Sequence, residues 1–222
     1  MTPFEELLSR ETPERAAEAA AYHKAPRRYL GLTTAELAEL VQGWRDARSV
    51  EERVALADEL WQSDVHEARM AAAKLLVQAR IRPDAGVWAL ICAWVPQLDA
   101  WAIADAVTDA GARRLVADPT RLDEVEAWTG SEHLWSRRAA LEMTRPWAKL
   151  SKVKPEDLAI RERVLAWAET YTTDRDWFIQ KSLADWLRDL SKHDPERSRL
   201  FLEEHGEKMK RFARKEAGQH LG

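Results

Sequence analysis

The sequence has few of the residues that build disulfides, metal sites and membrane spans. Its single cysteine, Cys92, excludes an intrachain disulfide, fits a reducing cytoplasm and lies in an apolar stretch where we expect it to be buried. The chain has no HExxH, paired-cysteine or glycine-rich phosphate motif, so we predict no metal and no cofactor. It also lacks a signal-peptide pattern and the roughly 18-residue apolar run of a membrane helix. We therefore expect a cytoplasmic protein that does not enter a membrane.

The chain also lacks an overall basic charge, because its formal net charge is −4. That value argues mildly against nucleic acid, but the basic residues are clustered. Residues 133–154 carry six Lys or Arg against one acid, and residues 208–215 carry five with no acid. A third cluster lies at residues 23–28. Each cluster alone is typical of a solvated face, whereas three in an acidic chain indicate one basic surface.

Glycine and proline are scarce, at 8 and 9 residues, and most lie between segments with helical apolar periodicity. No segment shows the alternation of a strand. Thr33 and Thr173-Asp174 resemble helix N-caps, and four prolines stand near expected helix starts. The sequence therefore predicts an all-α chain with these helices: 3–23, 34–47, 50–62, 64–80, 84–96, 99–113, 121–128, 132–146, 155–171, 175–191, 194–204 and 207–218.

A weak repeat connects several of these helices. Residues 67–73, 135–141 and 177–183 each place a basic residue ahead of small and apolar ones, at spacings of one or two helix pairs. Stacked helix pairs of this length form an α-solenoid of HEAT type. We therefore predict a single domain over residues 1–222, a right-handed solenoid of HEAT-like repeats with a concave basic face.

Trp101 and Asp105 form the most informative pair. At about 100° per residue they fall together on one side of a helix, opposite the apolar residues Ile103, Val107 and Ala110. An indole face beside a carboxylate, aimed away from the local core, suits a flat cationic ligand. The alternative is a surface tryptophan packed against the next repeat beside a solvated aspartate.

The predicted helix 175–191 divides into two faces. Four residues form its core stripe: Ile179, Leu183, Leu187 and Leu190. Lys181, Asp185 and Arg188 line the opposite face, which alone indicates a salt-bridged solvent face, while Trp186 flanks the core. On another predicted helix, Arg138 lies three residues after Trp135, as either a core-edge packing residue or a phosphate contact.

Several segments, in order from about residue 3 to residue 220, resemble the AlkD family of bacterial DNA alkylation repair glycosylases, which are built from HEAT-like repeats. The segments are YLGLTT (29–34), ELW (59–61), WxxxD (101–105), LWSRRAA (134–140), FIQK (178–181) and RKEA (214–217). No single motif is diagnostic, but their order and spacing together are specific.

The resemblance implies excision of cationic purines such as 7-methylguanine and 3-methyladenine from double-stranded DNA, by a protein that we expect to be a monomer. It implies that Asp105 is the key catalytic residue, that Trp101 lines the lesion and that Arg138 supports the site. The residues expected to contact DNA are Tyr22, Lys24, Arg27, Arg28, Trp135, Arg137, Lys181, Asp185, Arg188, Arg214 and Lys215.

The implied chemistry is consistent with these residue types. An alkylated purine is already cationic and leaves readily, so the enzyme must stabilise the positive charge that grows on the sugar. A carboxylate stabilises that oxocarbenium ion and holds the attacking water, as in sugar hydrolysis. Most glycosylases flip the base into a pocket, whereas the resemblance implies excision without flipping.

The sequence departs from the family pattern at two positions. Asp185 stands where the family has a lesion-facing tryptophan, and Trp186, one residue later, is turned by about 100° around the helix. Thr33 stands where the family has a glutamine. Asp185 either adds a negative charge near the sugar or pairs with Lys181 or Arg188. Two alternatives to an active glycosylase therefore stay open: a silent protein that binds bent or damaged DNA, and a HEAT-like scaffold with tryptophans as interface anchors.

Overall fold

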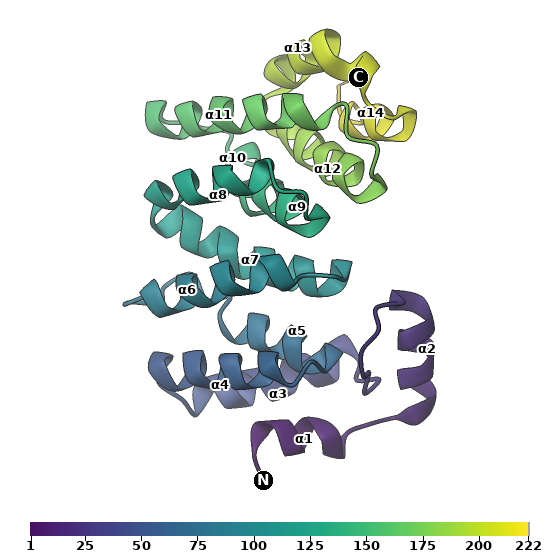
Figure 1. Ribbon diagram of the computed structural model, residues 1–222. Coiled ribbons are helices and arrows are strands. Elements are labelled where there is room, and N and C mark those ends of the chain that lie inside the picture. Colours follow the sequence, from purple (N-terminus) through teal and green to yellow (C-terminus); the bar gives the residue numbers. More distant parts are fainter. Residues whose placement is uncertain (222) are drawn as a thin grey trace. The chain divides into compact units, whose positions relative to one another are not determined.

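The computed structural model describes residues 1–221, which form α-helices joined by short loops and 3-10 turns (Figure 1). These residues contain no β-strand, and a parallel bridge between Arg28 and Val65 is isolated. The predicted all-α repeat fold is therefore confirmed.

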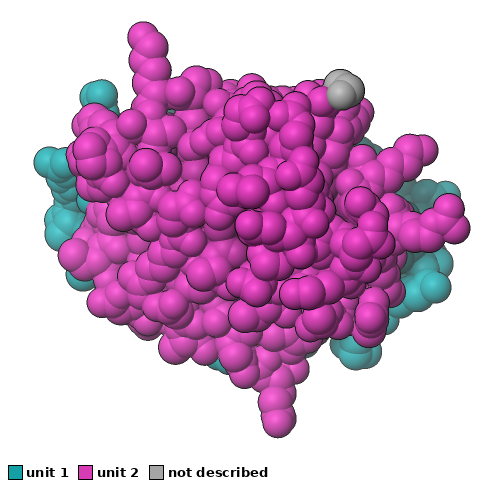
Figure 2. All heavy atoms as spheres, turned by 90° about the horizontal axis from the view of Figure 1, so that it is seen from above, with its two compact units in different colours: residues 1–117 teal, residues 118–222 magenta. Residues whose placement is uncertain are grey.

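The helices group into two compact units, Met1–Ala117 and Asp118–Gly222 (Figure 2). Each unit has its own buried core. The single domain over residues 1–222 stays a prediction.

Unit 1 is built from stacked helical hairpins. Its helices are α1 (Pro3–Ser9), α2 (Pro13–His23), α3 (Thr34–Asp46), α4 (Val50–Gln62), α5 (His66–Leu75), α6 (Ala85–Trp94), the 3-10 helix η1 (Val95–Gln97) and α7 (Trp101–Ala117). Helix α4 packs against α5, and α6 packs against α7. The two hairpins stack because α5 also contacts α7 and α4 also contacts α6. This is the HEAT-like packing expected from the sequence.

The single helix predicted at residues 3–23 is wrong, because the chain forms α1 and α2 there. Pro13 starts α2, and the residue before it, Thr12, is extended at φ −121° and ψ 100°. A proline ring disfavours the helical conformation at the preceding residue, which breaks the helix.

Other predicted bounds also differ. The helix predicted at 64–80 ends at Leu75, and the one predicted at 99–113 continues to Ala117. The helix predicted at 132–146 is divided into Leu134–Met143 and Arg145–Ala148, where Pro146 starts a new turn, and the one predicted at 207–218 is divided into a 3-10 helix, Gly206–Lys208, and an α-helix, Arg211–Ala217.

Local capping explains several helix starts. The predicted cap at Thr33 is confirmed, since its hydroxyl accepts the Glu36 amide while the Glu36 carboxylate accepts the Thr33 amide. The cap of helix α12 (Trp177–His193) lies two residues later than predicted. There the Asp176 carboxylate accepts the Phe178 amide at 2.7 Å, and Asp174 instead accepts the Asp176 amide at 2.8 Å.

Two parallel indoles lie in the core of unit 1. Trp61 and Trp94 are 0% and 1% exposed, and their rings stack at 4.4 Å with an interplanar angle of 8°. The Trp61 ring nitrogen donates to the Gln97 side chain at 3.0 Å, and the Arg69 guanidinium lies 4.7 Å from the Trp61 ring centroid. Cys92 is half-buried rather than buried, because it lies on a less covered side of α6 than Ile91.

Unit 2 is organised around α12. Its helices are η2 (Pro119–Arg121), α8 (Leu122–Thr129), α9 (Leu134–Met143), α10 (Arg145–Ala148), α11 (Pro155–Tyr171), α12 (Trp177–His193), α13 (Pro195–His205), η3 (Gly206–Lys208) and α14 (Arg211–Ala217). Helix α12 contacts α9, α10, α11, α13 and α14. The core stripe predicted on α12 is confirmed, since its four residues are all fully buried, and so is Trp186.

The buried side chain of Gln180 joins three segments of unit 2. Its amide nitrogen donates to the carbonyls of Tyr171 and Asp174 at 3.0 and 2.9 Å, and its oxygen accepts the Lys210 amide at 2.8 Å. Gln180, part of the FIQK segment, therefore fixes the approaches to α12 and α14 from inside.

Candidate functional site

Trp101 and Asp105 line an open cavity of about 340 Å³ in unit 1. Both side chains are half-buried, whereas Ile103 and Val107 on the opposite side of α7 are fully buried. The predicted facing of the pair is therefore confirmed. Asp109, one turn further along α7, also lines the cavity and is exposed.

Aromatic rings from the end of α2 pack beside Trp101. The Tyr22 ring, 69% exposed, stands edge-on to the indole at 6.1 Å, and the His23 ring lies 5.4 Å from it. Tyr22 was expected near DNA, and the structure places its ring beside Trp101. His23 had appeared only as a member of a basic cluster.

A second histidine, not identified from the sequence, continues this aromatic wall. His66 is 6% exposed and lies 4.5 Å from the His23 ring and 4.8 Å from the Tyr29 ring. Burial, assisted by His23 and Arg27, lowers the pKa of His66 to about 3, and burial also lowers the pKa of His23. Both imidazoles are therefore neutral at neutral pH.

The charges that line the cavity are mainly acidic. Glu67, Asp105 and Asp109 line it together with one cation, Lys74. Neutral imidazoles and an indole beside carboxylates make a surface that favours a flat cation over an anion.

The loop before α3 is held against the cavity by Glu67. This carboxylate, 4% exposed, accepts the Leu30 amide at 2.9 Å and the Gly31 amide at 2.8 Å. Gly31 has φ +77°, and a Cβ there would lie 2.5 Å from the Ala16 nitrogen. Only glycine fits this approach to α2, so Glu67 and Gly31 together fix the loop whose next residue, Leu32, lines the cavity.

The structure separates the members of the 23–28 cluster. The Arg27 side chain is 2% exposed and forms ion pairs with Asp64, at 3.5 Å, and with Asp99. Its guanidinium therefore joins two loops of unit 1, and the expected DNA contact of Arg27 stays a prediction. Arg28 is exposed and pairs with Glu11 at 2.6 Å, whereas Lys24 is exposed and makes no ion pair with the described residues.

In unit 2, Arg138 is buried in a charged network. It pairs with Glu142 at 3.2 Å, and its guanidinium lies 5.9 Å from the Trp135 ring. Glu142 also accepts from Ser182 at 2.8 Å and pairs with Arg145 at 3.3 Å. With Arg138 8% exposed, this arrangement fits the core-edge alternative, in which the arginine supports Trp135.

The guanidinium of Arg137 also has all of its partners within unit 2. It pairs with Asp174 at 3.1 Å and donates to the carbonyls of Ser131 and Glu132 at 2.9 and 3.0 Å. In the C-terminal cluster Arg214 pairs with Glu207, while Lys215 is exposed and makes no ion pair with the described residues.

Asp185 belongs to a charge quartet between α12 and α14. It pairs with Lys181 and Arg188 at 2.7 Å each, and Glu216 pairs with the same two cations at 2.6 and 3.6 Å. Asp185 therefore pairs with both candidate partners. The fully buried Trp186 does not take its place at the surface.

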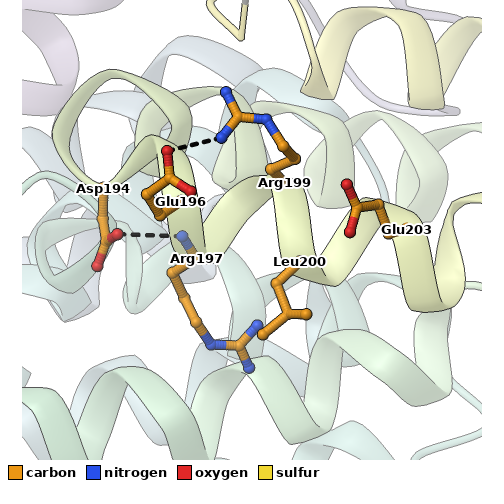
Figure 3. Close-up of a pocket in the computed structure, with 6 residues that line it drawn as sticks. All are labelled: Asp194, Glu196, Arg197, Arg199, Leu200 and Glu203. Atoms are coloured by element: carbon orange, nitrogen blue, oxygen red, sulfur yellow. Dashed lines mark hydrogen bonds and ion pairs between the residues drawn. The ribbon is translucent and has the colours of Figure 1, made fainter.

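A second depression, of about 550 Å³, lies along α13 (Figure 3). Its charged side chains neutralise one another: Arg199 pairs with Glu196 at 2.7 Å, and Arg197 pairs with Glu162 at 2.9 Å. It offers no concentrated charge for a ligand.

Within residues 1–221, no group of three or more His, Cys, Asp or Glu is arranged to hold a metal ion. None of the helices in the same range has both the length and the apolar character needed to cross a membrane.

Comparisons with known proteins point to one family. A family model described as "DNA alkylation repair enzyme" matches residues 4–221. The fold is similar to a predicted DNA alkylation repair enzyme from Enterococcus faecalis, with a TM-score of 0.78, 23% identity, and coverage of 96% of this chain and 97% of that chain. It is also similar to AlkD2 from Streptococcus mutans, with a TM-score of 0.63, 19% identity and coverage of 94% and 96%. A search of curated proteins found no match.

Proposed function

The chain belongs to the DNA alkylation repair enzyme family, and we propose that it is a DNA glycosylase acting on cationic alkylated purines, such as 7-methylguanine and 3-methyladenine, in duplex DNA. Membership confirms the resemblance inferred from the sequence. The observation that carries the proposal is the placement of Asp105 beside Trp101 in the acidic cavity of unit 1.

Asp105 is the proposed catalytic residue. As the bond from the sugar carbon to the purine nitrogen breaks, its electron pair leaves with the base and neutralises the purine, while positive charge grows on the sugar. A fixed carboxylate stabilises that charge more than it stabilises the ground state, and it holds and deprotonates the water that attacks the sugar carbon.

The aromatic wall suits the cationic substrate. Trp101 and Tyr22 offer ring faces, whose negative potential attracts a flat cation. Because burial keeps His23 and His66 neutral, these rings add aromatic surface without repelling the alkylated base.

Fewer residues are proposed to contact the DNA backbone than were expected from the sequence. Lys24, Arg28 and Lys215 are exposed and are proposed to bind phosphates. Arg138 is proposed to support Trp135, whereas Arg27 is assigned to the loops of unit 1.

The experiment is excision from a duplex that contains one 7-methylguanine, with free base measured by chromatography and abasic sites by alkaline cleavage. Asp105→Asn is expected to lower the single-turnover rate by about 100-fold or more. Asp109→Asn is the matched control, since Asp109 lines the same cavity one turn away, and it should retain the wild-type rate within about threefold. Equal rates for Asp105→Asn and wild type would refute the proposed role.

One observation favours the second candidate, a silent protein that binds damaged DNA. Asp185 stands at the position of the expected tryptophan and is held in the charge quartet. This candidate predicts that the wild type releases no base yet binds duplex DNA with an affinity that falls as salt rises. A protein-interaction scaffold would also release no base, but it would not bind duplex DNA.

A further inference from the structure

Unit 2 exposes an aromatic residue that the proposed reaction does not use. Trp177, at the start of α12, is 51% exposed. Phe212 of α14 lies nearly parallel to the indole, at 5.9 Å and 19°, while Phe178 meets it edge-on at 5.1 Å. Phe178 in turn contacts Trp135 at 4.8 Å. The exposed indole is therefore supported from beneath by packed rings, which limits the rotamer freedom that binding would have to remove.

Two exposed basic residues stand close in the chain to this pair of stacked rings. Arg175 precedes Trp177 by two residues and Arg211 adjoins Phe212 in the chain; both are exposed and make no ion pair with the described residues. The nearby carboxylates have other partners. Asp174 pairs with Arg137, Asp176 caps α12, and Glu216 lies in the charge quartet. We call Trp177, Phe212, Arg175 and Arg211 the Trp177 surface.

We propose that the Trp177 surface binds an unpaired nucleotide of a DNA strand. The base would stack on the open part of the indole, while Arg175 and Arg211 bind the adjacent phosphates. Stacking of bases on aromatic side chains beside cations is the general mode of single-strand recognition, and it tolerates any base because every base has a flat face.

The same geometry argues against a base-paired duplex as the occupant. A base within a duplex is stacked on both faces, so it cannot also stack on Trp177, whereas an extrahelical or single-stranded base can. An acidic peptide would satisfy the two arginines but would leave the indole without a flat partner. The surface therefore selects unstacked nucleotides, independently of the chemistry proposed for Asp105.

Binding is tested by fluorescence anisotropy with a labelled 12-nucleotide single strand and the matched duplex, in an Asp105→Asn background that prevents excision. Trp177→Ala should weaken single-strand binding by about 5- to 100-fold and duplex binding by less than about twofold. Trp177→Phe should retain most of the affinity. Leu158→Ala, which removes a residue 44% exposed on α11, is the matched control and should change neither affinity.

The charged part of the proposal has its own measurement. Arg175→Gln and Arg211→Gln should each reduce the slope of log affinity against log salt by about 0.7 for the single strand. Wild-type single-strand affinity in a folded Trp177→Ala variant, checked by circular dichroism, would overturn the proposal. Equal losses for single strand and duplex, or displacement by poly-glutamate as effective as by unlabelled oligonucleotide, would also overturn it. Because excision is not measured, failure of the glycosylase proposal leaves this result interpretable.

Discussion

Substitution of Glu67 tests how the loop beside the cavity of unit 1 is kept in place. Its buried carboxylate accepts two backbone amides, at 2.9 Å from Leu30 and 2.8 Å from Gly31. Glu67→Ala removes both acceptors and leaves two buried amide donors without their protein partner. We therefore expect the loop that contains Leu30 and Gly31 to open far more often than in the wild type.

The expected cost follows from those two bonds. Each buried amide left without an acceptor costs about 1–3 kcal/mol, so the loss of both acceptors in Glu67→Ala should destabilise unit 1 by about 2–6 kcal/mol. Glu67→Gln retains one acceptor oxygen but places an NH₂ group against the second amide, so its cost should be about half as large.

Native-state hydrogen exchange of the Leu30 and Gly31 amides measures this effect directly. Since about 1.4 kcal/mol corresponds to a factor of ten, protection should fall by about 30-fold or more in Glu67→Ala. Glu59→Ala is the control, because Glu59 is exposed on α4. If the two amides in Glu67→Ala kept protection within about threefold of wild type, the assignment of Glu67 as the support of this loop would be refuted.

Two further predictions concern charge. The pKa of His66 is about 3 in the folded protein, against an ordinary 6.5. Between these two pH values the unfolded chain therefore binds the proton more readily than the folded protein does. The contribution of His66 to stability should be complete above pH 6.5 and fall by at most about 1.4 kcal/mol per pH unit as the pH is lowered towards 3. Urea unfolding across this range should show a shallower decline for His66→Phe, and identical declines would contradict the burial argument. Asp185→Asn breaks two ion pairs of partly exposed groups, at a cost of about 1 kcal/mol, and leaves Lys181 and Arg188 facing one carboxylate. The affinity for duplex DNA should increase, and so should the slope of log affinity against log salt concentration. An unchanged slope in a binding titration would contradict the idea that Asp185 neutralises Lys181 and Arg188.

Helices were predictable where their signals were local. The predicted bounds 50–62 and 155–171 coincide with α4 and α11, because Ser49 caps the first and Pro155 starts the second. The error at residues 3–23 came from giving apolar periodicity more weight than Pro13. The facing of Trp101 and Asp105 was also predictable, because it depends only on rotation along one helix.

The environment of each charge was not predictable in this way. Arg27 looked like an exposed basic residue, but Asp64 and Asp99 come from distant parts of the sequence and enclose it. The contact between His23 and His66 likewise depends on how α2 packs against α5. Such pairings are set by tertiary packing, and helical periodicity carries no information about them.

The stacked indoles of Trp61 and Trp94 give unit 1 an optical property of its own. Two nearly parallel rings 4.4 Å apart have coupled electronic transitions, so their near-ultraviolet signal differs from that of separated tryptophans. Both rings lie within residues 1–117, so this difference should disappear when unit 1 opens, whatever the state of unit 2. The protein therefore contains its own probe for following the melting of one unit in the presence of the other, without an added label.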